Sequence, residues 1–450
     1  MPNKLGNHLI SQIYFYLIYI IICSIFSLWI YLFIVSINSF LKIKSLKSGS
    51  ADMVTAETSK SNASLAKFPR INSLNHYYHA DSMGMDTLSF PFVSVIVPAR
   101  NEEREIERCL VSILKQKYPS FEVIAIDDCS TDSTLDKMKK VKDDYPQLTD
   151  KLTVLSTTDY KEKPEDWFGK PWVSEKAFEK SKGSIILFTD ADSYYFNPYA
   201  ILITVSYMLK ENLDVLGGLP YLRLQDILSK IVMPLWNLLS ILLADAGKVN
   251  DPNRLDMAYL LGSYFLIKRD VFLKVGTYNS VKDAIQEDFD LALVLKKKGY
   301  RLRLVKIDSL VSALWSRDAI TLWQGVGRTI VPVAVRNIEK ILFAFFNIFY
   351  LATLPFIVCF TLVLDIVLYG LEVPTNLLLF STLLCCTVIV ATYIKGLIQY
   401  KEKKPWFAVI SVVGSMFLLV NYLINLLPLL IKKRKVVKWR ARVYNFKVYT

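Results

Sequence analysis

The sequence predicts an α/β domain built on a mostly parallel sheet, with transmembrane helices towards both ends of the chain. Between residues 92 and 190, short apolar strands alternate with helical segments, an order typical of a parallel sheet covered by helices on both faces. The strands are apolar throughout, as expected for strands buried on both faces. Charge-free apolar stretches and a mean hydropathy of +0.32 over 450 residues indicate membrane segments.

The predicted elements of the domain follow one another in a regular order. The run FVSVIV (92–97) is the first strand, and residues 102–118 form the first helix, with apolar residues at helical spacing on one face. The remaining elements are strands at 121–127, 151–156 and 184–190 and helices at 130–141 and 173–183.

Apolar stretches near both ends of the chain predict membrane anchoring. Residues 11–40 contain no charged side chain and exceed the roughly 20 residues that a transmembrane helix needs. The apolar region of a signal peptide is shorter, about 7–15 residues, so we expect an uncleaved anchor. The predicted regions are an N-terminal transmembrane anchor (1–44), a polar tether (45–90), the α/β domain (91–335), C-terminal transmembrane helices (336–431) and a basic tail (432–450).

The net charge of +13 is concentrated in residues 432–450, which hold eight basic residues and no acidic one. A nucleic-acid-binding patch is one interpretation. A basic cluster beside an apolar helix is more typical of the cytoplasmic face of a membrane with anionic lipid. We therefore expect the membrane as a partner and no nucleic acid. None of the six cysteines forms a C-x-x-C pair, so the sequence predicts neither a zinc site nor a disulfide framework.

Basic residues also indicate the topology. Arg336 and Lys340, with the lysines that follow the first anchor, place the α/β domain in the cytoplasm. Four simple crossings would leave the basic tail outside, against the positive-inside rule. Either 341–371, which contains Pro355, is not one simple pass, or 407–431 returns to the side from which it entered. We expect a multi-pass integral protein of the cell membrane, with its domain and its tail in the cytoplasm.

Polar residues follow three of the predicted strands. Ligands of open parallel sheets bind beyond the carboxyl ends of the strands, so these residues should meet at one edge. No glycine-rich phosphate-binding loop of the G-x-x-x-x-G-K-[ST] or G-x-G-x-x-G type lies nearby. Each of the three strand ends carries acid or amide groups. The segments contain Pro98, Ala99, Asn101, Glu102 and Glu103 at the end of the first strand, Asp127 and Asp128 at the end of the second, and Asp190 and Asp192 at the end of the fourth.

Two acidic motifs suggest chemistry. Asp190 and Asp192, one residue apart, can present oxygens to Mg²⁺ or Mn²⁺, whose other ligands would be water and substrate phosphate. The alternative is that Asp190 caps a helix while Asp192 is solvated. Glu287 and Asp288 open a helix within 284–305, where acids favour the helix dipole; the functional alternative is a general base that removes a proton from an attacking hydroxyl.

Taken in order, the motifs resemble those of the family 2 inverting glycosyltransferases of the GT-A fold, over roughly residues 92–330. The segment DWFGKPWVSEKA (166–177), followed by D-A-D, is similar to the membrane-bound branch that glycosylates lipids, which includes ceramide glucosyltransferases and carotenoid or hopanoid-pathway enzymes. The resemblance implies a Rossmann-like, mostly parallel sheet. The motifs are P-A-x-N-E-E (98–103), D-D (127–128), D-x-D (190–192), G-x-x-x-x-x-x-R (262–269) and E-D (287–288).

The resemblance also implies roles for single residues. The donor would be a nucleotide sugar, with a UDP-sugar expected, and Asp288 would be the catalytic base. Asp190 and Asp192 would hold Mg²⁺ or Mn²⁺, while Trp323 and Glu287 would contact the acceptor. Lys170 has the alternative of a solvated loop lysine. The implied donor-binding residues are Pro98, Ala99, Asn101, Glu102, Glu103, Asp127, Asp128, Lys170, Asp190 and Arg328.

One motif departs from the processive members of the family. Processive synthases and ceramide glucosyltransferases carry Q-x-x-R-W, whereas Gln324 and Arg328 are one residue too far apart and no Trp follows. The segment 323–328 is closer to the W-x-G-x-x-K/R form of carotenoid-type enzymes, or it is a plain interfacial helix. The apolar segment 226–247 either packs in the core or lies along the bilayer surface.

The function expected from these observations is metal-dependent, inverting transfer of a sugar from a nucleotide-sugar donor to the hydroxyl of a lipid-like acceptor at the cytoplasmic membrane face. One alternative is a processive polysaccharide synthase, which the altered Q-x-x-R-W motif disfavours. Another is a non-catalytic membrane binding protein with a transferase-like fold. The intact Asp128, Asp190, Asp192 and Asp288 favour an enzyme over that alternative.

Overall fold

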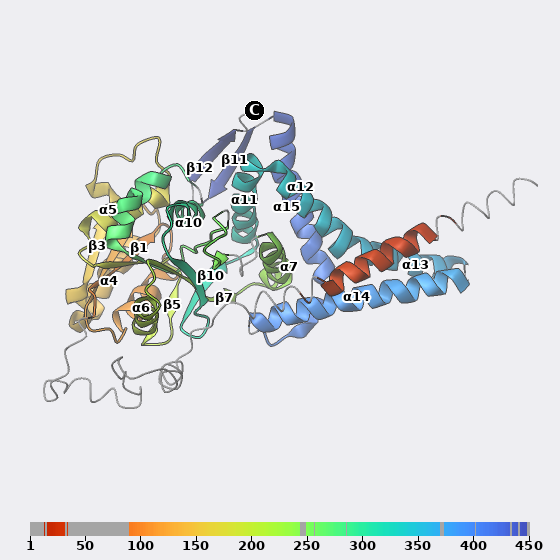
Figure 1. The fold of residues 1–450 in the computed structure, drawn as a ribbon, viewed down its shortest axis with the longest axis horizontal. Helices are drawn as coiled ribbons and strands as arrows, with labels where there is room; N and C mark the ends of the chain where they lie inside the picture. The colour runs from red at the N-terminus through yellow and green to blue at the C-terminus, as the bar shows by residue number, and fades with distance from the viewer. Residues whose placement is uncertain are drawn as a thin grey trace, which may run out of the picture. The chain divides into compact units, whose positions relative to one another are not determined.

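The computed structural model divides into two compact units (Figure 1). One, here called the α/β unit, comprises residues 43–223 and 246–314; the other, the helical unit, comprises 1–42, 224–245 and 315–450. Most of the predicted anchor flanks and the tether up to residue 89 lie outside the described residues. The structure describes residues 13, 16–31, 34, 90–243, 249–255, 257–284, 286–369, 373–400, 402–432, 434–439 and 442–447.

The α/β unit is built on a seven-stranded sheet with the order β3-β2-β1-β4-β8-β6-β9. The first four strands in this order are parallel to one another, and β8 alone is reversed, antiparallel to both β4 and β6. This arrangement confirms the predicted, mostly parallel α/β class. The strands are β1 (Val93–Ala99), β2 (Phe121–Asp127), β3 (Leu152–Ser156), β4 (Ile185–Phe188), β6 (Val215–Leu219), β8 (Phe265–Lys268) and β9 (Leu302–Lys306).

A smaller sheet and a set of helices complete the α/β unit. The small sheet has the order β5-β10-β7, with β5 at Tyr194–Tyr195, β10 at Val311–Ser316 and β7 at Tyr221–Leu224. The α-helices are α3 (Ile106–Leu114), α4 (Thr134–Asp144), α5 (Gly169–Lys180), α6 (Ala200–Lys210), α9 (Arg269–Val275) and α10 (Glu287–Lys297), and the short 3₁₀ turns are η3 (Pro146–Lys151), η4 (Thr157–Asp159) and η5 (Thr277–Val281).

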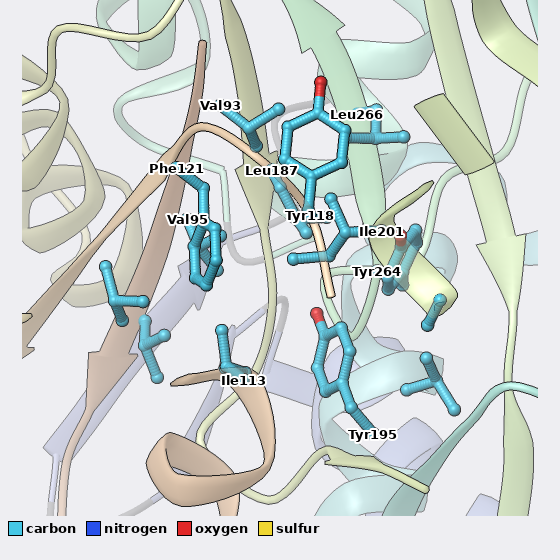
Figure 2. Packing of buried hydrophobic residues seen from close by; sticks show 14 of the residues in the cluster. Val93, Val95, Ile113, Tyr118, Phe121, Leu187, Tyr195, Ile201, Tyr264 and Leu266 are labelled. Carbon is cyan, nitrogen blue, oxygen red and sulfur yellow. The ribbon is translucent and has the colours of Figure 1, made fainter. Parts of the chain in front are cut away.

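The central strands are buried on both faces, which explains their continuous apolar sequence. Alternate residues of β1, such as Val95 and Ile96, belong to separate apolar clusters on opposite sides of the sheet. Figure 2 shows the first cluster, in which Val93 and Val95 pack with Ile113 of α3 and Ile201 of α6. The second cluster contains residues of α5 and α10. Helices therefore cover both faces, as predicted.

The predicted helices have different boundaries in the structure: the one expected at 130–141 is α4 (Thr134–Asp144), and the starts of the other two bear on the site. The helix expected at 102–118 begins only at Ile106, because the residues before it form a turn in which Asn101 has a positive φ of 53°. The helix expected at 173–183 begins earlier, at Gly169. Gly169 and Pro171 resemble helix breakers, but a first turn tolerates both. Lys170 therefore lies on a helix rather than in a loop.

The helical unit contains three helices that are long and apolar enough to cross a membrane, counted over the described residues: Ile338–Leu368, Leu378–Ile398 and Ser411–Lys432. A shorter apolar helix, Tyr16–Tyr31, represents the predicted anchor. The other described elements of the helical unit are α7 (Ile227–Leu243), α11 (Ala319–Arg336), α12 (Ile338–Asn347), the π-helical turn η6 (Ile348–Thr353), α13 (Leu354–Tyr369), α14 (Val373–Gln399), η7 (Pro405–Ala408), α15 (Ser411–Lys432), β11 (Arg434–Trp439) and β12 (Arg442–Lys447).

Pro355 does not break its helix; it follows the π-helical turn η6. A proline has no N–H to donate to the carbonyl four residues earlier, which here belongs to Leu351. The indole N–H of the buried Trp29 donates to that carbonyl at 2.8 Å. A polar group that would cost free energy in an apolar layer is thereby satisfied, and the N-terminal helix is joined to η6.

The side-chain amides of the asparagines of α15 form hydrogen bonds where the helices pack. Asn421 is fully buried and donates to the carbonyl of Trp323 on α11 at 3.0 Å, while Asn425 donates to the Asn421 side chain at 2.9 Å. Gly327 of α11 leaves room for Asn425, since a Cβ there would lie 3.1 Å from its Nδ2. Polar contacts next to small residues are typical of helix pairs in membranes. The predicted basic tail begins with a β-hairpin, β11–β12.

Candidate functional site

Three strand ends of the large sheet meet at one edge, as the sequence predicted. β2, β1 and β4 are parallel neighbours, and the register pairs Ala99 with Asp127 at the end of β1 and β2. The main-chain N–H of Asp128 donates to the carbonyl of Ala99 at 2.8 Å. Pro98 is the penultimate residue of β1. These residues therefore form one continuous floor at the carboxyl ends of the strands.

The loop after β1 is tied to the loop after β2. Ser130 Oγ accepts from the N–H of Asn101 at 3.0 Å, and Asn101 Oδ1 accepts from the N–H of Thr131 at 2.9 Å. The N–H of the buried Glu102 donates to Thr134 Oγ1 at 2.8 Å. The N–H of Glu103 donates to Asp132 at 3.2 Å. The predicted donor-binding segment is thus a stiff wall, not a mobile loop.

The buried carboxylate of Asp127 points to a ligand. Its side chain is 2% exposed, and Oδ2 accepts from the N–H of Ser130 at 3.1 Å. Oδ1 is buried and has no hydrogen-bond partner among the described residues. An unsatisfied buried acceptor costs about 1–3 kcal/mol. A ligand hydroxyl or N–H bound beside Asp127 and Asp128 would recover that free energy.

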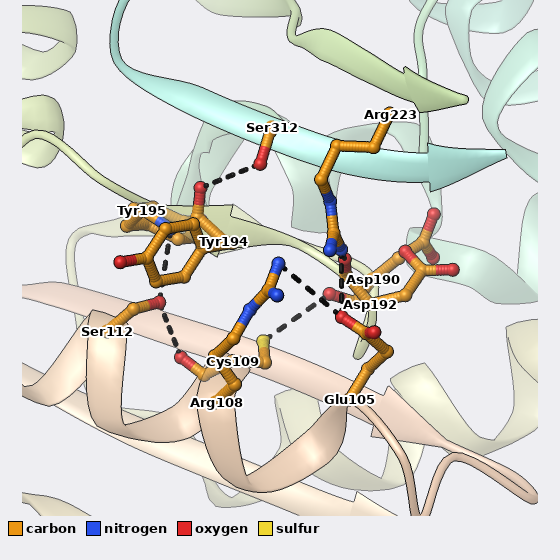
Figure 3. A network of polar contacts seen from close by, with 10 residues as sticks. All are labelled: Glu105, Arg108, Cys109, Ser112, Asp190, Asp192, Tyr194, Tyr195, Arg223 and Ser312. Atoms are coloured by element: carbon orange, nitrogen blue, oxygen red, sulfur yellow. Dashed lines mark hydrogen bonds and ion pairs between the residues drawn. The ribbon is translucent and has the colours of Figure 1, made fainter. Parts of the chain in front are cut away.

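The turn after β4 carries Asp190 and Asp192 and is held from two sides. Figure 3 shows Arg223 of β7 and Glu105, just before α3, meeting at this turn. Arg223 Nη2 donates to the main-chain carbonyl of Asp192 and to Glu105 Oε2, both at 2.8 Å. The Cys109 thiol lies 3.6 Å from the carbonyl of Asp190. These contacts fix the backbone of the turn and leave the carboxylates to other partners.

Arg223→Met should lower the thermal stability of the protein. The side chains of Arg223 and Glu105 are only 15% and 12% exposed, and removing the arginine leaves Glu105 with the more distant Arg108, 3.6 Å away. We expect a loss of about 2–3 kcal/mol, below the about 3–5 kcal/mol of a fully buried pair, read as a lower Tm. Glu105→Leu in addition should recover most of it. Arg104→Met, at the exposed position just before Glu105, is the control. An unchanged Tm for Arg223→Met would contradict the stabilising role of the pair.

Lys170 joins the two acidic motifs. Its ammonium lies 2.7 Å from Asp190 Oδ1 and 3.0 Å from Glu287 Oε1. Burial lowers the pKa of Lys170, but the carboxylates of Asp190, Glu287 and Asp288 outweigh it and raise the pKa well above its usual value. Motifs almost a hundred residues apart in the sequence, at 190–192 and 287–288, are thereby brought into one site.

Asp288 lies in the first turn of α10 and is held by two backbone groups. The N–H of Gly262 donates to Oδ2 at 2.7 Å, and the N–H of Phe289 donates to Oδ1 at 2.9 Å. Burial, and next the neighbouring Glu287 carboxylate, raise the pKa of Asp288 to about 6, while Lys170 and the two N–H groups oppose the rise. A carboxylate with this pKa can accept a proton near neutral pH.

Sequence reasoning missed two contributors to the site, Arg223 and Glu105, and assigned no role to a third, Gly262. Gly262 begins the G-x-x-x-x-x-x-R motif, and its role comes from its N–H and its missing side chain. The arginine of that motif, Arg269, donates to the carbonyl of Gly183 at 2.6 Å and so stabilises the start of β4. A charged residue inside the otherwise apolar strand Y-L-R-L was the available signal for Arg223.

The acidic side chains fit a cation that is shared with a substrate. Among the residues that the structure describes, no group of three or more His, Cys, Asp or Glu side chains could enclose a metal by itself. Mg²⁺ is usually bound through one or two carboxylates plus substrate phosphates, which suits Asp190 and Asp192. Lys170 is paired with Asp190 and Glu287, whereas Asp192 and Asp288 add further negative charge. This excess of negative charge favours the binding of a divalent cation.

Two predicted site residues belong to the helical unit. Trp323 and Arg328 lie on α11. The Trp323 ring packs edge-on against Phe417, with ring centres 5.2 Å apart. Their predicted roles, in acceptor and donor binding, stay predictions.

The comparison with protein families agrees with this geometry. The family model described as "Glycosyl transferase family 2" matches residues 94–276. The chain carries a family 2 glycosyltransferase domain. That domain contains the predicted donor-binding segment, both strand-end aspartate pairs, Lys170 and Gly262, and its match supports the predicted GT-A fold.

Curated relatives of the transferase domain act on several classes of acceptor. Poly(ribitol-phosphate) beta-N-acetylglucosaminyltransferase TarS of Staphylococcus aureus strain Mu50 is 34% identical over 125 residues, covering 27% of this chain and 20% of that protein. The 4,4'-diaponeurosporenoate glycosyltransferase of S. aureus strain USA300 is 26% identical over 200 residues, covering 44% and 50%. The matches thus span a fifth to half of these relatives.

One solved structure aligns with much of the chain at low similarity. The mannosyltransferase PcManGT from Pyrobaculum calidifontis, in complex with GDP-Man and Mn²⁺, aligns with 18% identity and a TM-score of 0.43, over 78% of this chain and 94% of that one.

Proposed function

We propose that the transferase domain catalyses metal-dependent, inverting transfer of a sugar from a nucleotide-sugar donor, with a UDP-sugar expected, to the hydroxyl of a lipid-like acceptor at the cytoplasmic face of the cell membrane. The observation that carries the proposal is the meeting of Asp190, Lys170, Glu287 and Asp288 at the ligand edge of the sheet. A cation site and a base with a raised pKa are the two groups that such a transfer needs.

The donor would lie along the edge formed by β2, β1 and β4. Asp127 and Asp128 would bind the base and ribose, since Asp127 Oδ1 is a buried acceptor with no partner among the described residues. The tied loop with Asn101, Glu102 and Glu103 would form the wall beside the nucleotide. A stiff wall of this kind lowers the entropy cost of binding.

Asp190 and Asp192 would hold Mg²⁺ or Mn²⁺ against the diphosphate. When bound, the cation would stabilise the negative charge that develops on the departing phosphate. The chain contributes the two carboxylates and holds them in position, because Arg223 fixes the main-chain carbonyl of Asp192, shortly before the start of β5. Lys170 would add a second positive charge near the diphosphate.

Asp288 would act as the base. Its carboxylate accepts the proton of the acceptor hydroxyl while the hydroxyl oxygen forms a bond to the anomeric carbon. The bond from that carbon to the phosphate oxygen breaks on the opposite face, so the configuration inverts and the nucleoside diphosphate leaves. The N–H groups of Gly262 and Phe289 hold both carboxylate oxygens in place. Glu287 would lie beside the acceptor.

A lipid-like acceptor is supported by the helical unit. Three described helices are long and apolar enough to cross a membrane, and one relative is named as a 4,4'-diaponeurosporenoate glycosyltransferase. The apolar helix α7 would guide such an acceptor along the bilayer surface. Trp323 would stack against the acceptor, and Arg328 would reach phosphate.

A donor screen tests the proposal directly. Purified full-length protein in detergent is heated with each common nucleotide sugar in the presence of Mn²⁺, because a ligand that binds the folded state raises Tm. The donor that raises Tm is then offered with lipid acceptors, and the product is identified by mass spectrometry. If no nucleotide sugar raised Tm, the proposal would be contradicted.

The rate of transfer should fall below about pH 6. Asp288 is active as a base only when ionised, and burial and Glu287 raise its pKa to about 6. We expect kcat/KM, which reports the free enzyme, to drop about tenfold per pH unit below that value. The measurement is a pH profile at low donor concentration, with donor binding followed separately. A flat profile down to pH 5 would assign the base to another group.

A further inference from the structure

The ammonium of Lys170 occupies a confined position. A Cβ on Gly262 would lie 2.3 Å from Lys170 Nζ and 3.5 Å from Asp288 Oδ2, so only a glycine leaves room for the ammonium here. The same Gly262 donates its N–H to Asp288. Gly262 and the carboxylates of Asp190 and Glu287 thus define a seat for one positive charge, built from α5, the turn after β4, the segment before β8, and α10.

The seat shares Asp190 with the proposed cation site. An ammonium 2.7 Å from Asp190 Oδ1 and a divalent cation ligated by the same carboxylate repel each other, since like charges a few ångströms apart interact strongly at a partly buried site. A cation bound by Asp190 and Asp192 therefore has to compete with Lys170. The diphosphate of a donor offers the lysine another anionic partner close by.

We propose that Lys170 is an internal counter-ion of the cation site: it competes with the divalent cation for Asp190 and transfers to the diphosphate when the donor binds. This inference rests on the proposed function, because it takes the cation and the diphosphate from it. Its consequence is thermodynamic coupling: cation and nucleoside diphosphate each strengthen the binding of the other, and the protein alone binds the cation weakly.

Lys170→Met tests the inference with two binding measurements on the full-length protein in detergent. The first is Mn²⁺ binding without nucleotide, read from the electron paramagnetic resonance signal of free Mn²⁺. The second is UDP binding, and GDP binding in parallel, at saturating Mn²⁺ by calorimetry. We expect Mn²⁺ to bind about tenfold tighter to the variant and the nucleoside diphosphate about tenfold weaker. A merely structural role would weaken both.

Gly262→Ala perturbs the same seat without removing a charge. The new methyl group would displace the flexible end of Lys170, so Mn²⁺ should again bind more tightly, though less so than in Lys170→Met. Because both changes act through one ammonium, the double variant should bind Mn²⁺ no more tightly than Lys170→Met alone. Lys282→Met is the matched control: it removes a lysine that pairs with Asp166 outside the site, and both affinities should stay unchanged.

The outcomes separate the inference from the function on which it rests. If wild-type protein binds Mn²⁺ equally well with and without UDP or GDP, and Lys170→Met binds it no better, the counter-ion role is wrong while the cation site stands. If no variant binds Mn²⁺ under any of these conditions, the proposed cation site and the inference both fail. Thermal unfolding of each variant shows whether it is folded; if Lys170→Met is not, the Gly262→Ala result decides.

Discussion

Asp288→Asn is expected to lower the rate of sugar transfer by about 10²–10⁴-fold, the range typical of a lost general base, while donor binding stays within about twofold of wild type. Asparagine keeps the shape of the side chain and one oxygen that can accept the N–H of Gly262 or Phe289. It cannot take the proton of the acceptor hydroxyl. The loss should therefore appear in kcat, measured at saturating donor and acceptor.

The matched control is Asp283→Asn, which neutralises an exposed aspartate a few residues earlier in the chain. Its transfer rate should equal that of wild type. Loss of donor binding in Asp288→Asn, to the same extent as loss of rate, would give the residue a structural role in the donor site instead. A rate within threefold of wild type would move the base to another side chain.

Asp192→Asn should abolish the response of the enzyme to Mg²⁺ or Mn²⁺. The side chain is 8% exposed, so few waters can replace a lost ligand oxygen. Since even outer-shell partners of a metal contribute about 10–100-fold to affinity, loss of a direct ligand should weaken Mn²⁺ binding by about a hundredfold or more. The transfer rate of the variant should match that of wild-type protein treated with EDTA.

Two controls accompany this experiment: one restores the metal ion, and the other removes a carboxylate outside the site. Mn²⁺ added back after EDTA should restore the wild-type rate but not that of Asp192→Asn. Asp166→Asn, which removes an exposed carboxylate paired with Lys282, should keep full metal dependence. A wild-type rate that is indifferent to EDTA would show that Asp190 and Asp192 serve the donor without a cation.

Local sequence patterns predicted the parallel half of the sheet well. The strand expected at 121–127 is β2 as observed, because an apolar run that ends in acidic residues leaves little choice of register or boundary. The strand-end aspartates follow from the same reasoning, since the carboxyl ends of neighbouring parallel strands share an edge. The start of α5 was harder to predict, because Gly169 and Pro171 disrupt helices everywhere except in the first turn.

Contacts between distant segments lay beyond the reach of sequence patterns. Nothing in the strand FLIK (265–268) reveals that β8 runs against its neighbours, because an apolar run has no direction. The hydrogen bond from Gly262 to Asp288 depends on that arrangement, since the segment before β8, rather than the one after it, reaches the ligand edge. The Arg223–Glu105 pair depends likewise on how two sheets are joined.

The reversed strand also bears on how the protein is made. β4 is wholly apolar and pairs with β8 on one side, but β8 is synthesised roughly 80 residues later, or about 4–16 s at about 5–20 residues per second. Until then β4 offers an open apolar edge, a template for association between nascent chains. Any fragment that ends at residue 223 would keep that edge for good. A fragment made from the α/β unit of this protein should therefore extend through Leu314, the end of that unit.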